Sequence, residues 1–182
     1  MAANGGRHQL GPDSGRLTLR TYRSGLAAQA GHDLTIDVTR WSGQLGQDQL
    51  DATIDLTSLA IREGRGGIKP LTDRDRRDIT GQARKALDTG RYPEAAYAAT
   101  SFSPDDSGGG AIDGTLTLHG QSHPLRLQVS KTGDGQYRAT ATVVQSQFGI
   151  KPYSGMFGAL KLRDDVELEV TVDLSDSPGA EP

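Results

Sequence analysis

Two histidines could supply ligands to a metal ion. His119 and His123 lie on either side of a predicted hairpin turn. A stable zinc site needs three or four protein ligands, and the chain contains no cysteine that could complete the set. The absence of cysteine also excludes disulfides, iron–sulfur clusters and cysteine nucleophiles. We therefore interpret both histidines as exposed turn residues and expect neither a metal nor another cofactor.

A glycine-rich segment from Glu63 to Pro70 has the glycines and the lysine of a phosphate-binding loop. Lys69 lies between Ile68 and Pro70, so the Gly-Lys-Ser/Thr ending of such loops is missing. The chain also has no Gly-x-Ser-x-Gly elbow, and no pair of carboxylates is spaced as an acid–base couple. The segment therefore predicts a mobile connection, and the chain as a whole is predicted not to be an enzyme.

His32 follows Gly31 and opens a predicted strand. An imidazole at the rim of a barrel could hydrogen-bond the head of a ligand or fix a loop in place. The simpler interpretation is a hydrogen-bonded structural histidine. If the protein were an enzyme acting on a bound ligand, His32 is the one titratable candidate that the sequence offers.

Residues 147–158 gather two of the three phenylalanines and one of the two methionines. Apolar side chains among glycines could form the wall or mouth of a pocket, since small-molecule sites are mostly apolar with few polar contacts. Lys151 and Tyr153 could then place an ammonium and a phenol at the mouth for an acidic head group. In the alternative, Met156 and Phe157 form a hydrophobic plug at the end of a barrel. The sequence leaves both open.

The elements that position these residues are mostly strands, because apolar residues recur at every second position in several stretches. The clearest are residues 166–174 and a hairpin formed by residues 112–118 and 125–129. The 24 glycines among 182 residues favour short elements joined by turns. The pattern predicts about eight or nine antiparallel strands, closed as a barrel or folded as a sandwich.

One helix is predicted over residues 72–89. Thr72 and Asp75 have the spacing of a capping box in which Asp replaces the usual Glu. Gly81 weakens the helix. Three apolar residues fall on one face of it: Ile79, Ala83 and Leu87.

Residues 1–15 and 175–182 are rich in Gly, Pro, Ala and Ser, and we predict both to be disordered tails around one domain at 16–174. The first fifteen residues contain no apolar run of the kind that forms a secretory signal or an anchor. We therefore expect a cytoplasmic protein without stable membrane insertion. The net charge of -3 gives no general attraction to nucleic acid, so no nucleic-acid partner is expected. Whether the protein forms a homodimer stays open.

Four sequence blocks follow one another along the chain. They are Gly31-His32-Asp33 with Trp41-Ser42-Gly43; Ala86-Leu87-Asp88 with Tyr92-Pro93-Glu94 and Thr100-Ser101-Phe102; Gly114-Thr115-Leu116-Thr117-Leu118-His119-Gly120 with Pro124-Leu125; and Phe148-Gly149-Ile150 with residues 166–174. In this order they resemble the YceI-like family of lipocalin-like, polyisoprenoid-binding proteins. The resemblance covers residues 16–174. The Arg-Asp-rich stretch at 74–78 departs from the family's Arg-Asp-x-His-Leu pattern.

The resemblance implies an all-β fold, an extended eight-stranded antiparallel lipocalin-like β-barrel with one short helical connection and an elongated apolar pore. It also implies a ligand, either a long-chain isoprenoid or a fatty amphiphile. Small residues among the larger aliphatic ones would leave room for it, and the strand register decides which of the alanines face inward. These small residues are Ala52, Ala96, Ala98, Gly114, Ala139 and Ala141. Each buried methylene would contribute about 0.8 kcal/mol, so a long chain could bind without a strong polar anchor.

Twelve residues are expected to contact this ligand, taken from inward strand faces, from the rim of the barrel and from the aromatic segment. They are His32, Ile36, Ile54, Phe102, Leu116, Leu118, Phe148, Ile150, Lys151, Tyr153, Met156 and Phe157. The alternative function is a stress-response or protein-interaction module whose barrel is filled and holds no lipid.

Overall fold

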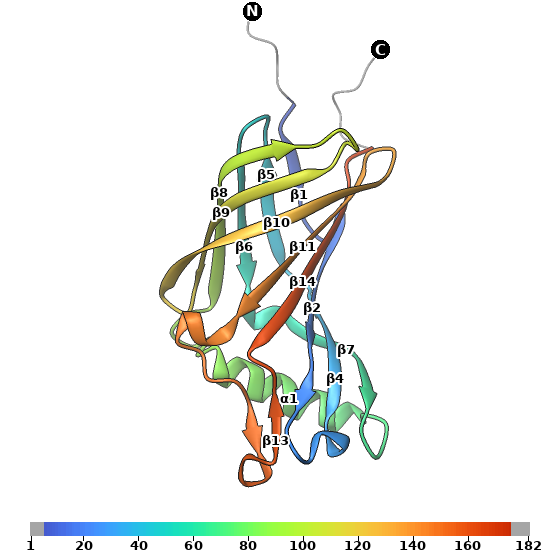
Figure 1. Ribbon diagram of the computed structural model, residues 1–182, viewed down its shortest axis with the longest axis vertical. Coiled ribbons are helices and arrows are strands. Elements are labelled where there is room, and N and C mark those ends of the chain that lie inside the picture. Colours follow the sequence, from blue (N-terminus) through green and yellow to red (C-terminus); the bar gives the residue numbers. More distant parts are fainter. Residues whose placement is uncertain (1–5, 176–182) are drawn as a thin grey trace, which may run out of the picture.

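A computed structural model describes residues 6–175, which form fourteen strands and one α-helix (Figure 1). One antiparallel sheet contains β1 (His8–Leu10), β2 (Gly15–Thr21), β4 (His32–Val38), β5 (Trp41–Leu45), β6 (Leu50–Asp55), β7 (Leu59–Gly66), β8 (Glu94–Pro104), β9 (Gly110–Leu118), β10 (Gln121–Gly133), β11 (Gln136–Val144) and β14 (Asp165–Asp173). A second sheet contains β12 (Ser154–Gly155), β13 (Leu160–Leu162) and β3 (Arg23–Ser24). Helix α1 (Asp73–Ala86) connects β7 to β8, and the short 3-10 helices are η1 (Ala28–Ala30), η2 (Leu56–Ser58), η3 (Gln145–Phe148) and η4 (Met156–Gly158).

Three long strands are each interrupted once. β1 is separated from β2 by residues 11–14, β4 from β5 by Thr39 and Arg40, and β6 from β7 by residues 56–58. Followed through these breaks, the pairing runs from β2 through β4 and β5 to β6, β8, β9, β10, β11 and β14, and then returns to β2. The antiparallel barrel-like fold predicted from the sequence is confirmed. Its strand count is corrected from eight to eleven in the main sheet, because the breaks divide three strands.

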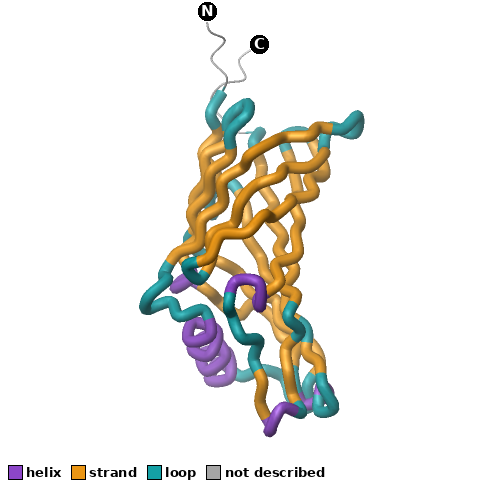
Figure 2. The backbone as a smooth tube through the Cα atoms, turned by 60° about the vertical axis from the view of Figure 1, so that its left-hand side comes forward, coloured by secondary structure: helices purple, strands orange, loops and turns teal. Residues whose placement is uncertain are grey.

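The sheet is open along one side of its lower half, where "lower" means the end that holds β13 in Figure 1. There β7 is an edge strand that pairs with β4 alone. Helix α1 lies at this open side (Figures 1 and 2). The upper half is therefore enclosed by strands, whereas the lower half has strands on one side and a helix on the other.

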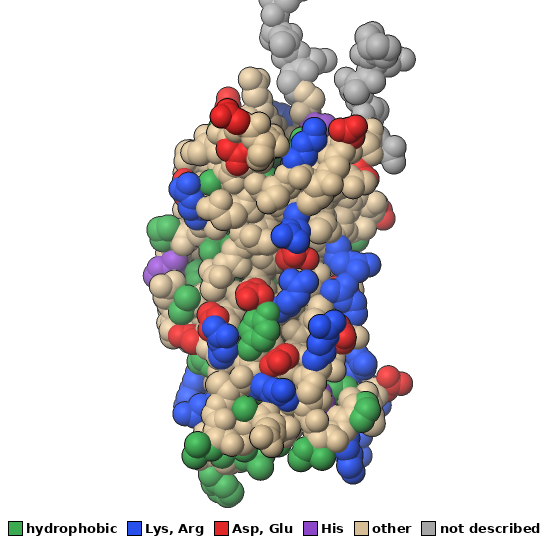
Figure 3. Space-filling view, turned by 45° about the vertical axis from the view of Figure 1, so that its right-hand side comes forward, with side chains coloured by type: hydrophobic (Ala, Val, Ile, Leu, Met, Phe, Trp, Pro, Cys, Tyr) green, Lys and Arg blue, Asp and Glu red, His purple; other side chains and the backbone are tan. Residues whose placement is uncertain are grey.

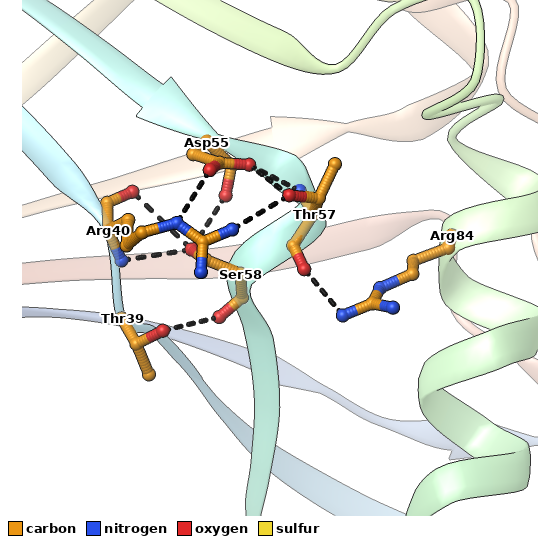
Figure 4. A network of polar contacts seen from close by, with 6 residues as sticks. All are labelled: Thr39, Arg40, Asp55, Thr57, Ser58 and Arg84. Carbon is orange, nitrogen blue, oxygen red and sulfur yellow. Dashed lines mark hydrogen bonds and ion pairs between the residues drawn. The ribbon is translucent and has the colours of Figure 1, made fainter.

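A network of polar contacts joins the two breaks that lie between β4 and β5 and between β6 and β7 (Figure 4). The Asp55 carboxylate accepts hydrogen bonds from the Thr57 amide (2.8 Å), the Thr57 hydroxyl (2.6 Å) and Nε of Arg40 (2.8 Å). The buried Ser58 hydroxyl accepts from the Arg40 amide at 2.9 Å and donates to the Asp55 carbonyl at 2.7 Å. Thr39 donates to the Ser58 carbonyl through both its amide and its hydroxyl. The network thus supplies partners for backbone groups that the breaks remove from the ladder.

Two arginines of α1 attach the helix to this side of the sheet. Arg84 donates to the Thr57 carbonyl, within the same network (Figure 4). Arg76 donates to the carbonyls of Ile61 (2.9 Å) and Arg62 (2.8 Å) on β7. The position of the helix therefore depends on the corner at which β6 turns into β7.

The helix begins with the predicted capping box. The Thr72 hydroxyl accepts from the Asp75 amide at 3.1 Å, and the Asp75 carboxylate accepts from the Thr72 amide at 2.8 Å. Helical structure ends at Ala86 rather than at residue 89. Ile79, Ala83 and Leu87 pack together against the lower core, as their spacing predicts. No helix within residues 6–175 is long and apolar enough to cross a membrane.

Residues 8–10 form β1, although the composition of residues 1–15 predicts a tail. They pair with β5, from His8 opposite Leu45 to Leu10 opposite Gly43. Three residues are too few for an alternating pattern to be visible in the sequence. The remaining predicted tail segments, residues 1–5 and 176–182, lie outside the described residues.

Replacing Asp55 by Ala is expected to lower the free energy of unfolding by about 1–2 kcal/mol, the usual cost of losing a side-chain cap. The change leaves the Thr57 amide and the Arg40 guanidinium without their carboxylate. Urea unfolding followed by circular dichroism measures the loss. Asp105 is a matched control, because its carboxylate accepts from the amide and hydroxyl of Ser107 in the same way, but in an exposed hairpin turn. Asp105→Ala is expected to cost about 0.5 kcal/mol or less.

The effect of Asp55→Ala should also depend on pH. Hydrogen bonds from the Thr57 hydroxyl and, to a smaller extent, from Arg40 hold the pKa of Asp55 below its ordinary value. A carboxyl with a lowered folded-state pKa stabilises the fold above its unfolded pKa, and this stabilisation is lost as the pH falls through the folded pKa. The difference between wild type and Asp55→Ala should therefore shrink below about pH 4. A difference that is constant from neutral to acidic pH would contradict this role.

Candidate functional site: the cavity beside α1

A cavity of about 820 Å³ lies in the lower half of the molecule, between the inner face of the sheet and α1. This volume is within the range of about 300–1,000 Å³ that is typical of small-molecule sites. Most of its wall is aliphatic, with side chains from β2, β4, β9, β13, β14 and α1. A cavity of this kind favours an apolar occupant over water.

The strand wall follows from residue alternation. Along β4, every second side chain lines the cavity, from His32 through Leu34 and Ile36 to Val38. The residues between them, such as Asp33 and Asp37, take part in polar contacts away from it. The apolar residues of β4 are buried, so this strand forms a continuous aliphatic surface.

The helix wall is looser. Ile79, Ala83 and Leu87 line the cavity at intervals of four residues, together with Ala86. No residue of α1 is fully buried. Movement of α1 would therefore expose no fully buried side chain of its own, and we infer that the cavity can open on this side.

The upper part of the barrel is filled by side chains. A Cβ atom on Gly114 would lie 2.4 Å from Cζ and Oη of Tyr97, so the space beside this glycine is occupied by the tyrosine ring. The Tyr97 hydroxyl donates to the Leu125 carbonyl at 3.1 Å, and burial raises the pKa of Tyr97 to about 12. Ala96 and Ala98 face solvent. The expectation that these small residues leave room for a ligand is therefore wrong.

Polar groups gather at the lower end of the cavity. Nε2 of His32 lies 2.8 Å from the Lys69 carbonyl, a contact in which the ring N–H donates. Nη1 of Arg23 donates to the Gly31 carbonyl at 2.8 Å. All four residues line the cavity. His32 therefore holds the connection between β7 and α1 in place, which is one of the two roles that the sequence left open. It also lines the cavity.

Two glycines in the glycine-rich segment from Glu63 to Pro70 make these close contacts possible. A Cβ atom on Gly66 would lie 2.0 Å from Nη1 of Arg23, and one on Gly67 would lie 2.3 Å from Nε2 of His32. Both glycines also have positive φ angles, 80° and 74°. They allow the chain to pass close to the two cationic side chains.

Thr21 contributes an unsatisfied polar group. Its hydroxyl oxygen is buried without a hydrogen-bond partner, the single case of this kind among the side chains of residues 6–175. Thr21 is 8% exposed and belongs to the cavity wall, two residues before Arg23 in the sequence. A buried hydroxyl without a partner is costly.

Seven of the twelve residues predicted to contact a ligand line the cavity. They come from β4, β6, β9 and the chain that follows η3: His32, Ile36, Ile54, Leu116, Leu118, Ile150 and Tyr153.

The other five predicted residues lie outside the cavity wall. Phe148 is 2% exposed within the core, and Phe102 packs against the same core cluster. Lys151 is exposed. Met156 is 58% exposed and Phe157 is fully exposed at the tip between β12 and β13, so they form neither a plug nor a pocket wall. Their placement at the pocket is corrected, because the hairpin of β12 and β13 extends beyond the end of the barrel.

Several wall residues were absent from the sequence prediction. Leu160 and Leu162 alternate on β13, and Val166 and Leu168 alternate on β14. Period-two alternation could have identified all four. Gln82, by contrast, faces the cavity from α1 without any signal in the sequence.

The two predicted turn histidines make separate contacts. The turn itself is only His119 and Gly120, both with positive φ, so the residues from Gln121 onward belong to β10. Nδ1 of His119 lies 3.0 Å from the Phe148 carbonyl, and the His123 ring packs edge-on against the Phe148 ring at 5.0 Å.

Comparison with known proteins places the chain in one family. The profile of the YceI-like domain matches residues 15–174. The chain is 34% identical over 96 residues to a UPF0312 protein of Shewanella sp. (strain W3-18-1), which is 48% of each protein. It is 32% identical over 90 residues to a UPF0312 protein of Pseudomonas savastanoi pv. phaseolicola, covering 44% of this chain and 47% of that protein. The matched part spans about half the length of these curated relatives.

Solved structures share the fold at lower identity. The crystal structure of BcnA from Burkholderia cenocepacia matches 87% of this chain and 94% of its own, with a TM-score of 0.60 and 16% identity. A mutant CJ YCEI protein matches 94% of this chain and 85% of its own, with a TM-score of 0.50 and 14% identity. These structures support a common barrel-like fold.

Replacing His32 by Ala is expected to loosen the connection between β7 and α1, because the Lys69 carbonyl loses its partner. Hydrogen–deuterium exchange should become faster in residues 64–71, with a loss of about 0.5–1.5 kcal/mol in local stability. His123→Ala is the control, since that imidazole contacts the Gln121 side chain and the Phe148 ring instead. Unchanged exchange in residues 64–71 of the His32 variant would show that the histidine does not hold the segment.

Proposed function

The chain belongs to the YceI-like domain family, and we propose that it binds and carries a long apolar lipid, a polyisoprenoid or a similar amphiphile, in the cavity beside α1. The observation that supports this most directly is the aliphatic cavity of about 820 Å³ in a barrel whose upper part is filled. Burial of each methylene would contribute about 0.8 kcal/mol, so a long hydrocarbon chain could bind tightly through its length alone.

The polar groups suit the head of such a molecule. The Thr21 hydroxyl lacks a partner, and Arg23 and Lys69 lie at the same end of the cavity. A ligand oxygen there would meet hydrogen-bond donors, while the hydrocarbon chain would extend upward along β4 and α1. The ligand would therefore lie with its polar end toward the lower end of the molecule.

We propose binding without catalysis. His32 was the one titratable candidate for chemistry, and its Nε2 is engaged with the backbone carbonyl of Lys69. The carboxylates in the cavity wall are also engaged, Asp75 in the capping box and Asp78 in an ion pair with Arg74 at 3.9 Å. A substrate would find no free acid or base among these groups.

Native mass spectrometry of the freshly purified protein, combined with organic extraction, tests the proposal. The expected result is a mass above that of the bare chain, or stoichiometric uptake of an added prenyl lipid. Ala83→Phe, which adds a ring to the cavity wall, should weaken uptake by about tenfold or more. Ala98→Phe places the same ring on the solvent side of β8 and should leave uptake unchanged.

Two results would contradict the proposal. One is a bare chain that takes up neither prenyl lipids nor fluorescent fatty probes, as expected of a protein-interaction module without lipid. The other is equal uptake by the two phenylalanine variants, which would place any bound lipid outside this cavity. Circular dichroism of both variants verifies that they are folded.

A further inference from the structure

The lower end of the molecule displays exposed apolar side chains on three separate tips. Four of the five exposed large apolar residues of the described chain lie on these tips, and the fifth, Tyr153, directly precedes β12. Leu26 (100% exposed) precedes η1, Ile68 (80%) lies between β7 and α1, and Met156 (58%) and Phe157 (112%) lie between β12 and β13. We call these four residues the apolar rim. Figure 3 shows hydrophobic side chains gathered at this end.

The tips are held side by side. The Ala27 amide donates to the Ala159 carbonyl at 2.8 Å, which joins the first tip to the third. His32 pairs with Gly66 in the ladder between β4 and β7, which joins the first tip to the second. These backbone contacts hold the three tips next to one another, so the apolar rim forms one continuous surface.

The rim surrounds the lower end of the cavity. Ile68 belongs to both the rim and the cavity wall, and the wall also includes Ala30, Tyr153 and Leu160 from the other two tips. A partner that covers the rim would therefore cover this end of the cavity. Isolated exposed apolar residues are common, but a cluster at the mouth of an apolar cavity indicates an interaction site.

The backbone at the third tip holds its apolar side chains outward at a cost. Met156 and Phe157 have φ angles of 50° and 56°, a conformation that is unfavourable for residues other than glycine. Strained backbone of this kind tends to occur at functional sites. A glycine or asparagine would fit both positions with less strain, so their large apolar side chains are unexplained by folding.

The charge of these segments is opposite to that of the whole chain. Residues 24–32, 64–70 and 151–162 contain four Lys or Arg and no Asp or Glu, whereas the net charge of the protein is -3. Arg65 is paired with Glu63 at 2.9 Å. No ion pair within residues 6–175 involves Lys69, Lys151 or Lys161.

From these observations we infer that the apolar rim docks on the surface of an anionic lipid bilayer. Exposed Phe, Met, Leu and Ile side chains would enter the boundary between head groups and acyl chains, and Lys69 and Lys161 would lie against the phosphates. Docking would place the cavity mouth against the bilayer. This surface proposal goes beyond ligand binding and can fail or succeed independently of it.

Vesicle flotation tests the proposal with two lipid compositions, phosphatidylcholine alone and an equimolar mixture of phosphatidylcholine and phosphatidylglycerol. The protein is expected to float with the anionic vesicles, to float less at high salt, and to stay unbound with the neutral ones. Leu26→Ser combined with Phe157→Asn should reduce binding about tenfold or more, because asparagine tolerates the left-handed backbone but not the acyl region.

Charge variants separate the rim from a general electrostatic effect. Lys161→Gln, which changes a side chain outside the cavity wall, should weaken binding to anionic vesicles about fivefold. Lys131→Gln removes the same charge from the ribbon of β10 and β11 and should leave binding unchanged. Circular dichroism and the lipid content by mass spectrometry verify that the variants are folded and loaded like the wild type.

Three outcomes would overturn the inference. In the first, the wild type does not float with anionic vesicles at low salt. In the second, the two charge variants weaken binding equally. In the third, analytical ultracentrifugation shows that the apolar substitutions abolish self-association while vesicle binding persists, which would make the rim an interface between copies of this chain. Loss of flotation with unchanged lipid content would separate failure of docking from failure of the lipid-binding proposal.

Discussion

The structure depends on a polar corner in which Asp55, Ser58 and Arg40 terminate two long strands at the same level. The ladder between β6 and β8 ends at this corner, where Asp55 lies opposite Glu94, the first residue of β8. Beyond it, β7 diverges and leaves an open side that α1 occupies, attached through Arg84 to the same corner. The hydrogen bonds that would be lost at a strand break are replaced within the corner, so the cavity is created without unsatisfied backbone groups at this point.

The corner divides one barrel into a filled half and a hollow half. The filled half contains large side chains such as Tyr97 and Phe148, packed against small residues such as Gly114. The hollow half has aliphatic strand faces, and neither β4 nor α1 contains a Phe, Tyr or Trp. The interior of the barrel is therefore filled along one part of the molecule and hollow along the other. The filled half contains the packed core, and the hollow half contains the cavity beside α1.

Regular patterns in the sequence predicted those elements that depend on neighbouring residues. The hairpin of β9 and β10, the strand β14 and the capping box at Thr72 were all predicted correctly, because alternation and capping depend on neighbouring residues. The strand breaks were missed, since the partners of Arg40 lie 15 or more residues away. Met156 and Phe157 were placed at the pocket because they are apolar, although their backbone directs them into solvent. The hydrophobicity of a residue alone does not show whether it lines the cavity wall or lies on the exposed apolar rim.

The central claim is that a long apolar ligand lies in the hollow half, between β4 and α1. A crystal structure of the protein loaded with a long-chain prenyl lipid tests it most directly. We predict continuous electron density for the hydrocarbon chain along Ile36, Val38 and Ala83, with the polar end near Thr21 and Arg23. An empty cavity in the loaded protein, or lipid density at another place on the molecule, would contradict the account.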